Sequence, residues 1–275
     1  MKRIMFLLAL IGTYILILSC AATHPEDVDT EPPRQPRMIP HLGVVGDVYF
    51  NEETKEWELV HTPRGEPLND FNNGIDSVSG EDAIRLQWER VIDNVGVSRI
   101  EVFRYANLPH LQTPELISPP ESLPGNAIAF TDNLIHTDVG VDWHYFIVAY
   151  DFAGNSSTSE PVNFMLEDRP VPIEPQMSTR LTNTRLRETT FIWEYDGAPV
   201  FKRFLIFRND NGRAGELVWS YDTSSIHEPM LMYTGEDDLE NGWYLWRIDV
   251  KGWVPDEDGV IRSGAKSRMM TFEII

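Results

Sequence analysis

Residues 142–155 read DWHYFIVAYDFAGN, and this stretch decides the fold class. From Trp143 to Ala149 every second side chain falls on the same side of an extended chain, which is the two-residue period of a β-strand. The stretch ends in DFAGN at 151–155, where glycine and asparagine tolerate positive φ. It therefore predicts a long strand followed by a tight turn.

The same alternation occurs on both sides of this stretch. Further strands are predicted over 84–88 (IRLQW), 99–105 (RIEVFRY) and 162–166 (VNFML), and DNVG at 93–96 marks a turn before the second of them. Many short strands with frequent turns, and no long helical period, are typical of an all-β sandwich.

The strand pattern occurs twice. Trp88 is followed by IEVFR at 100–104, and Trp193 is followed by FLIFR at 204–208. The two copies lie about 100 residues apart, which is the length of one sandwich domain. The sequence therefore predicts two tandem domains, over 74–168 and 171–275, with a short proline-rich boundary between them.

Both copies resemble fibronectin type III domains. In the first copy the resemblance rests on Trp88, on DNVGV at 93–97 before the IEVFR strand, and on AYDFAGNSS at 149–157. In the second copy it rests on Trp193, on FLIFR and on GWYLWRIDV at 242–250. The resemblance implies immunoglobulin-like β-sandwiches.

This family places a tyrosine at the start of its sixth strand, where the hydroxyl bonds to the backbone in a tyrosine corner. Tyr244 occupies that position in the second copy, so the resemblance implies the bond there. The first copy has Trp143 at the equivalent position and departs from the pattern.

The N-terminus has the features of an export signal. Two positive charges in Met1–Arg3 precede the apolar stretch Ile4–Leu18. The sequence Ile17-Leu18-Ser19-Cys20 then resembles the lipobox of bacterial lipoproteins, which implies removal of a signal peptide over 1–19 and acylation of Cys20. The protein is then expected in the bacterial cell envelope, on the outer membrane, with the periplasmic or surface side left open. An uncleaved membrane anchor, or an ordinary signal peptide with an unmodified thiol, are the alternatives.

Two segments separate this signal from the first domain. Residues 20–40 contain five prolines, which predicts an extended, polar tether. Residues 41–73 follow, and there VYF at 48–50 and WELV at 57–60 flank a polar turn. This pattern predicts an extra N-terminal β-hairpin.

Composition excludes several classes of function. Asp and Glu number 43 against 23 Lys and Arg, for a formal net charge of −20, which excludes the basic footprint of nucleic-acid binding. The chain contains neither a G-x-S-x-G turn nor an H-E-x-x-H pair, and its histidines are scattered. We therefore expect no enzyme, no cofactor and no metal site, although a weak calcium site in the acidic loops at 236–238 or 256–258 stays open.

Two sets of aromatic residues are candidates for partner binding. Phe103, Phe146 and Tyr150 fall on the outer face of the first domain. This face is too apolar to be exposed to solvent without a covering element. The predicted hairpin, a partner protein or the second domain could cover that face. In the second domain Trp219 lies on a predicted edge strand and Trp253 in a long loop, where a tryptophan can anchor an interface.

These observations favour a non-enzymatic, lipid-anchored envelope protein that acts as a protein-binding or spacer module. The membrane, through the lipid, and an envelope protein are the expected partners. The alternative is a carbohydrate-associated accessory protein of an extracellular glycan-degrading system. That alternative requires Trp219, Trp243 and Trp253 to be exposed and coplanar.

Overall fold

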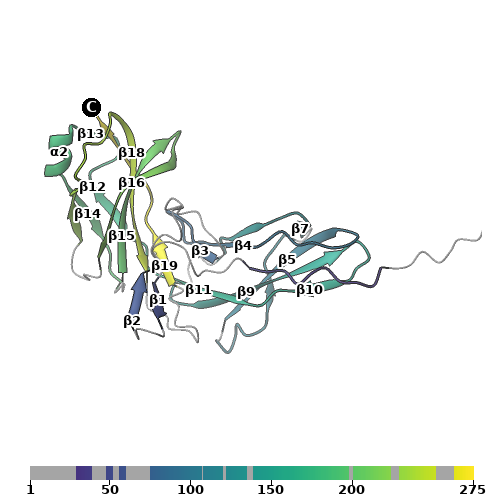
Figure 1. The fold of residues 1–275 in the computed structure, drawn as a ribbon. Helices are drawn as coiled ribbons and strands as arrows, with labels where there is room; N and C mark the ends of the chain where they lie inside the picture. The colour runs from purple at the N-terminus through teal and green to yellow at the C-terminus, as the bar shows by residue number, and fades with distance from the viewer. Residues whose placement is uncertain are drawn as a thin grey trace, which may run out of the picture.

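The computed structural model describes 29–38, 48–51, 56–59, 75–106, 108–119, 122–134, 139–197, 201–223, 229–251 and 263–275. These residues form two β-sandwich modules, as the alternation predicted, and the only helix among them is the short α2 (Asn183–Glu188) (Figure 1). Among the described residues, no helix has the length and hydrophobicity needed to cross a membrane.

The first module packs a small sheet against a larger one. The small sheet contains β3 (Ile75–Ser77), β4 (Ile84–Gln87) and β8 (Ala129–Asp132). The larger one contains β5 (Val97–Ala106), β6 (Glu115–Leu116), β7 (Leu123–Pro124), β9 (Asp142–Asp151), β10 (Ser156–Thr158) and β11 (Val162–Leu166). The inward-facing side chains of both sheets, among them Trp88, Tyr145 and Phe164, form one buried core.

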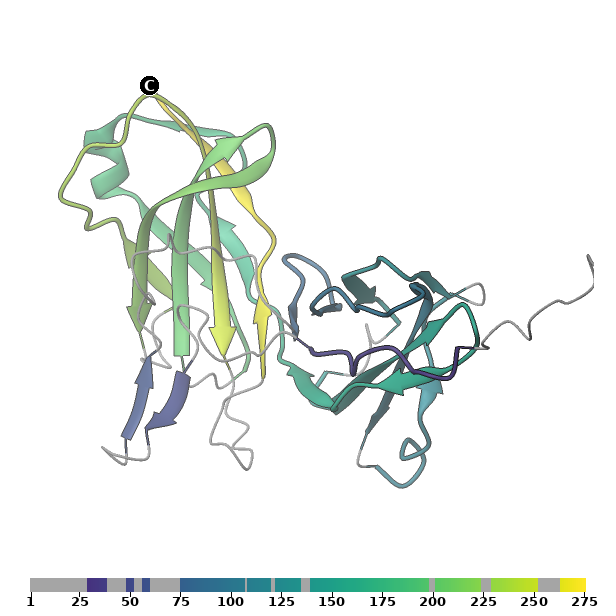
Figure 2. The same ribbon diagram turned by 45° about the vertical axis from the view of Figure 1, so that its right-hand side comes forward.

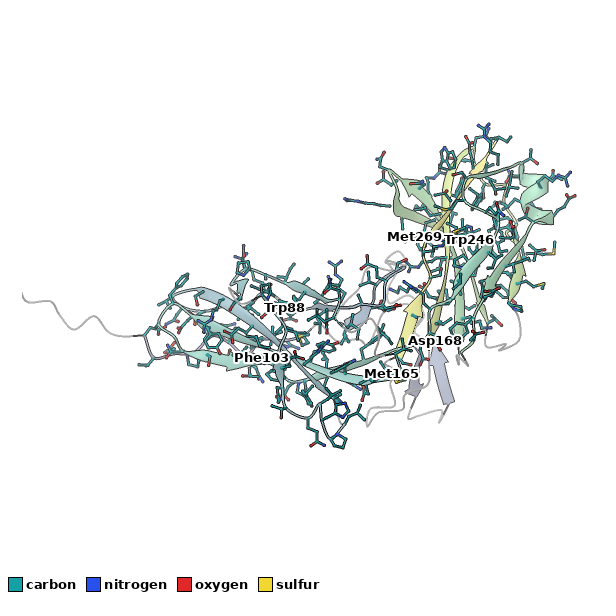
Figure 3. All side chains as sticks on the ribbon, turned by 180° about the vertical axis from the view of Figure 1, so that it is seen from behind. Trp88, Phe103, Met165, Asp168, Trp246 and Met269 are labelled. Atoms are coloured by element: carbon teal, nitrogen blue, oxygen red, sulfur yellow. The ribbon has the colours of Figure 1, made fainter. Side chains whose placement is uncertain are left out.

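The second module repeats this arrangement. Its small sheet contains β12 (Val171–Glu174), β14 (Thr190–Glu194) and β17 (Met230–Met232). Its larger sheet contains β13 (Thr179–Leu181), β15 (Phe201–Asp210), β16 (Arg213–Thr223), β18 (Gly242–Lys251), β19 (Ser263–Lys266) and β20 (Met270–Ile274). Trp193 and Trp246 lie in its core, and Figure 3 shows Trp88 and Trp246 inside their separate modules.

The last strand of each module is interrupted at a serine. In the first module the Ile147 amide donates to Ser159 Oγ at 3.0 Å, between β10 and β11. In the second module the Ile248 amide donates to Ser267 Oγ at 3.0 Å, between β19 and β20. This shared irregularity supports the internal repeat predicted from the sequence.

The tyrosine corner occurs where the sequence predicted it. Tyr244 donates its hydroxyl to the Glu240 carbonyl at 2.7 Å, and its ring is fully buried. In the first module the buried Trp143 Nε1 has no hydrogen-bond partner. The replacement of tyrosine by tryptophan therefore removes this bond from the first module.

The two larger sheets join into one sheet between the modules. β11 and β19 run parallel, with Met165 opposite Ser263 and Leu166 opposite Gly264. The path β13-β20-β18-β19-β11-β9-β5-β6 thus crosses from one module to the other. Figure 3 places Met165 at this junction. The sequence predicted only a stiff boundary here.

Further contacts fasten the junction. The Gly80 amide donates to the Lys266 carbonyl at 3.1 Å, and Ser79 Oγ donates to the Ser267 carbonyl at 2.8 Å. Lys266 Nζ lies 2.5 Å from Asp76 Oδ2, and the Lys266 side chain is only 8 % exposed. β3 and the loop that follows it are therefore held against the end of β19 in the second module.

The segment 29–38 belongs to the stretch that its prolines predicted to be an extended, polar tether. It is extended, but it lies along the first module (purple in Figure 2), where Met38 forms an isolated bridge with Trp88. The Arg34 amide also donates to the Ile92 carbonyl at 3.0 Å. Pro33, Pro36 and Met38 are buried, because their apolar rings and thioether cover the edge of the core.

The predicted hairpin is present. β1 (Val48–Asn51) and β2 (Glu56–Leu59) pair antiparallel, with Phe50 opposite Trp57. Figures 1 and 2 both place it beyond the ends of β15 and β16 in the second module, rather than over β5 and β9. The hairpin therefore does not provide the expected cover for the first module.

Candidate functional site

The outer face of β5 and β9 carries cross-strand pairs of rings. Phe103 lies opposite Phe146, with ring centroids 5.1 Å apart and planes 5° apart. Tyr105 lies opposite His144, with centroids 5.0 Å apart and planes 18° apart. Such pairs stabilise a sheet through direct side-chain contact.

Tyr150 continues this row toward the end of β9. The Arg99 guanidinium lies 3.7 Å from the centroid of its ring and also pairs with Glu101 Oε1 at 3.1 Å. Burial, followed by the nearby Glu101 carboxylate, raises the pKa of Tyr150 above its ordinary value. The phenol therefore stays neutral throughout the physiological range.

We call Phe103, Tyr105, His144, Phe146 and Tyr150 the aromatic face. The three binding candidates predicted in this module, Phe103, Phe146 and Tyr150, all belong to it. All five residues are half-buried. The rings contact one another, and the Arg99 guanidinium lies over the ring of Tyr150. Cover of this face by a partner protein stays a prediction.

The second module has charged residues at the equivalent positions of β18. Arg247 and Asp249 form a bidentate pair, with nitrogen–oxygen distances of 2.8 and 2.9 Å. The pair is nevertheless buried, and its side chains are 5 % and 7 % exposed. Leu205 and Phe207 on β15 are buried on the same face. The aromatic face is therefore a property of the first module.

The described tryptophans do not form a shared platform. Trp219 is half-buried on the core side of its sheet, where its ring lies 5.5 Å from that of Phe204 and 5.0 Å from that of Tyr233. Trp243 lies on the opposite side of the same sheet and is 42 % exposed. Trp253 lies outside the described residues. The alternative function thus lacks the coplanar pair that it required from Trp219 and Trp243.

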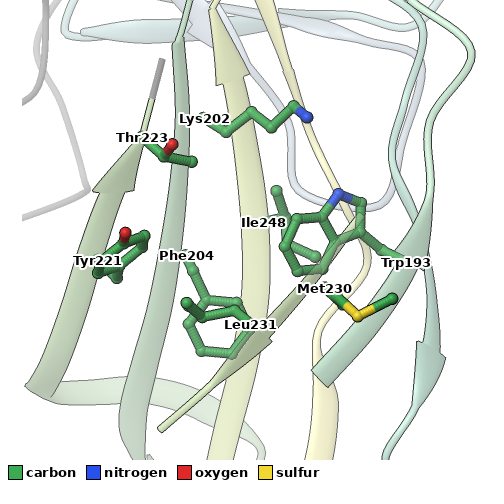
Figure 4. Close-up of a pocket in the computed structure, with 8 residues that line it drawn as sticks. All are labelled: Trp193, Lys202, Phe204, Tyr221, Thr223, Met230, Leu231 and Ile248. Atoms are coloured by element: carbon green, nitrogen blue, oxygen red, sulfur yellow. The ribbon is translucent and has the colours of Figure 1, made fainter. Parts of the chain in front are cut away.

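A small cavity opens between the two sheets of the second module (Figure 4). It is lined mostly by apolar side chains, including Trp193, Phe204, Leu231 and Ile248. Its volume is about 10 Å³, which is near the minimum needed for a single water. Ligand sites are typically at least about 300 Å³, so this cavity is a packing defect.

The titratable groups near the junction do not converge on that cavity. Burial raises the pKa of Tyr195 well above its ordinary value, and the Glu167 and Asp168 carboxylates add to this effect. Burial also raises the pKa of Glu167. None of these three residues lines the cavity, so they form no acid–base pair around it. The absence of enzymatic activity stays a prediction.

One group of carboxylates among the described residues has the geometry of a metal site, and the sequence analysis missed it. Asp29, Asp93 and Asp151 come from three segments far apart in the sequence, yet each contributes an oxygen within 4.8 Å of the others. In the acidic loop predicted instead, Asp238 pairs with Arg187 at 2.6 Å. The second predicted loop, 256–258, lies outside the described residues.

Comparison with known proteins assigns this chain to no family. No protein-family model matches it, and no curated protein does. A solved structure of pectate lyase PelI from Erwinia chrysanthemi is similar at 22% identity and a TM-score of 0.25, over 33% of this chain and 26% of that one. The same lyase in complex with tetragalacturonic acid is similar at 18% identity and a TM-score of 0.25, over 40% of each chain.

A third solved structure, of the chicken CNTN1 FN1-FN3 domains, covers more of the chain. It is 16% identical with a TM-score of 0.27, over 73% of this chain and 65% of that one. Such low TM-scores carry no argument about function. The β-sandwich fold class rests on the strand order and the two cores described above.

Proposed function

We propose that this chain is a non-enzymatic, lipid-anchored envelope protein that acts as a protein-binding or spacer module. The aromatic face is the observation that carries this proposal. Aromatic residues are enriched at protein interfaces, and a few of them supply most of the binding energy. The proposed partner is an envelope protein.

The junction supports a fixed arrangement of the two modules. Independent modules on a flexible linker would sample many orientations, whereas here β11 and β19 share backbone pairing. The Lys266–Asp76 pair and the Ser79–Ser267 hydrogen bond add side-chain contacts across the same boundary. The second module is thus fixed relative to the aromatic face.

The binding proposal is tested with the full-length protein and aromatic-face variants. Phe146→Asp removes the central ring of the face, and Phe152→Asp is the matched control because Phe152 is 73 % exposed in the adjacent turn. A photo-crosslinker at position 103 identifies the neighbour in cells by mass spectrometry. We expect Phe146→Asp to weaken binding of that neighbour by at least about tenfold, and Phe152→Asp to leave it unchanged. Equal binding by the Phe146 variant, with its fold verified by circular dichroism, contradicts the proposed face.

The anchor is tested separately. Cys20→Ala should abolish incorporation of labelled palmitate and move the protein from the membrane fraction to the soluble fraction, because two or more acyl chains give stable anchoring. Protease shaving of intact cells then distinguishes the surface side from the periplasmic side. An unmodified Cys20 thiol on a freely soluble wild-type product contradicts the lipid anchor.

A further inference from the structure

Three carboxylates meet at the end of the first module that lies away from the second. Asp29 begins the segment that lies along this module, Asp93 lies in the turn before β5, and Asp151 ends β9. In Figure 2 the purple segment starts at this far end and runs back toward the junction. One oxygen from each carboxylate lies within 4.8 Å of the other two.

Two of the carboxylates are held in place by the backbone of their own loops. Asp93 Oδ2 accepts from the Val95 and Gly96 amides, both at 2.9 Å. Asp151 Oδ1 accepts from the Gly154 amide at 2.5 Å and from the Asn155 amide at 2.8 Å. These bonds fix the direction of each carboxylate before any ligand arrives.

Asp29 is held from two sides. Its Oδ1 accepts from Asn94 Nδ2 at 3.0 Å, and its backbone carbonyl accepts from Asn155 Nδ2 at 3.0 Å. Asn94 and Asn155 follow Asp93 and Asp151 in their own loops. The two asparagines therefore draw Asp29 toward the other two carboxylates.

Two of the remaining carboxylate oxygens are unsatisfied. Asp29 Oδ2 and Asp93 Oδ1 are both completely buried and have no hydrogen-bond partner. Within the described part of the chain, no lysine or arginine forms an ion pair with Asp29, Asp93 or Asp151. A buried carboxylate oxygen without a partner is costly, and two of them beside a third carboxylate add like-charge repulsion. A cation would remove both costs.

The third carboxylate is almost fully buried. Asp151 has only 2 % of its surface exposed, and its Oδ2 accepts from Asn155 Nδ2 at 2.7 Å. The Asp151 carboxylate is therefore fixed beside those of Asp29 and Asp93.

We propose that Asp29, Asp93 and Asp151 bind one calcium ion, which fastens the membrane-proximal segment to the first module. Calcium takes carboxylate, carbonyl and water oxygens at 2.3–2.6 Å in flexible geometry, so two oxygens on the same ion are separated by at most about 5 Å. The oxygens here satisfy that limit without rearrangement. Magnesium requires a smaller and nearly ideal octahedron, which three loop carboxylates fit less well. The site does not depend on the aromatic face.

Titration of the EDTA-treated full-length protein in detergent with calcium chloride tests the site. Isothermal calorimetry should show one ion per chain with a Kd on the order of 10⁻⁴ M, as in extracellular calcium modules, and magnesium should bind at least about tenfold more weakly. Asp29→Asn and Asp93→Asn should each weaken calcium binding by about tenfold or more. Asp210→Asn, at the exposed end of β15 in the second module, is the matched control and should change nothing.

A second readout follows the segment itself. Calcium should slow tryptic cleavage after Arg34 and Arg37 in the wild type, and Asp29→Asn should abolish that protection while far-ultraviolet circular dichroism stays unchanged. Absence of calorimetric binding up to 10 mM calcium (about a hundredfold above the expected Kd) overturns the proposal. Calcium binding that Asp93→Asn leaves intact overturns it as well, since the acidic chain would then bind calcium elsewhere. Equal affinity for magnesium overturns the choice of ion.

Discussion

Both modules have an arginine at the same position of the repeat, but its environment differs between them. Arg104 in the IEVFR strand pairs with Asp132 at 2.9 Å, and the two side chains are 9 % and 0 % exposed. Arg208 in the FLIFR strand pairs with Glu240 at 2.8 Å, and there the two side chains are 41 % and 78 % exposed. Both guanidinium groups also lie over an aromatic ring of the neighbouring long strand, Trp143 of β9 or Tyr244 of β18.

This difference shows how one repeated position acquires two structural roles. Arg104 connects the two sheets of its module through the interior, because Asp132 belongs to β8 and also accepts from the Tyr145 hydroxyl at 3.1 Å. Arg208 lies at the surface, and its module is held together instead by rings such as Phe191, which contacts Phe204, Trp246 and Phe272 edge-on. Burial, rather than residue identity, decides which ion pair supports the fold.

The largest effect is expected when the buried ion pair of Arg104 and Asp132 is removed. Asp132→Ala should lower the free energy of unfolding by about 3–5 kcal/mol, because the buried Arg104 loses its buried carboxylate partner and keeps only a 3.4 Å contact with the exposed Glu115. Glu240→Ala removes the equivalent carboxylate at the surface and should lower it by less than about 1 kcal/mol. Urea denaturation followed by tryptophan fluorescence measures both. Equal losses in the two variants would contradict the distinction between buried and exposed pairs.

An intermediate effect is expected at the junction. Asp76→Asn should lower the free energy of unfolding by about 1.5–3 kcal/mol, because it takes the charged partner from the nearly buried Lys266. Calorimetric unfolding should then separate into two transitions as the modules uncouple. The control is Asp82→Asn, since Asp82 faces Arg169 at 3.6 Å and both side chains are about one-third exposed. Two transitions in the wild-type protein would show that the modules are not coupled.

The smallest effect is expected at the tyrosine corner, where the second module has Tyr244 and the first has Trp143. Tyr244→Phe should lower the free energy of unfolding by about 0.5–1.5 kcal/mol through the lost bond to Glu240. Burial raises the pKa of Tyr244 in the folded state, so its contribution is complete below pH 10 and is lost as the pH rises from the unfolded-state pKa through the folded-state pKa. The variant should therefore lose less stability above pH 10 than the wild type. Identical alkaline profiles in urea denaturation would contradict this role.

Local pattern was sufficient to predict most of the fold. Alternation identified the β5 and β9 strands, and the repeat identified two modules. The corner bond of Tyr244 was implied by the resemblance to fibronectin type III domains. The aromatic face was also predictable, since Phe103, Phe146 and Tyr150 fall on one side of neighbouring strands. All of these depend on residues close in sequence or on one repeated unit.

The features that sequence did not predict depend on contacts between distant segments. The pairing of β11 with β19 joins two edge strands about 100 residues apart, and backbone groups carry no residue-specific signal for such pairing. The prolines of 29–38 indicated an extended chain, but not the surface it would lie against. Asp29, Asp93 and Asp151 fit no linear motif, because three separate loops bring them together.

The pairing of β11 with β19 also bears on solubility. An isolated sandwich leaves the backbone groups of its edge strands free to recruit a strand from another molecule, which is a common origin of aggregation. Here two such edges satisfy each other within one chain. Separating the modules by cleavage or truncation would expose both edges at once, so each half should be more prone to self-association than the intact protein.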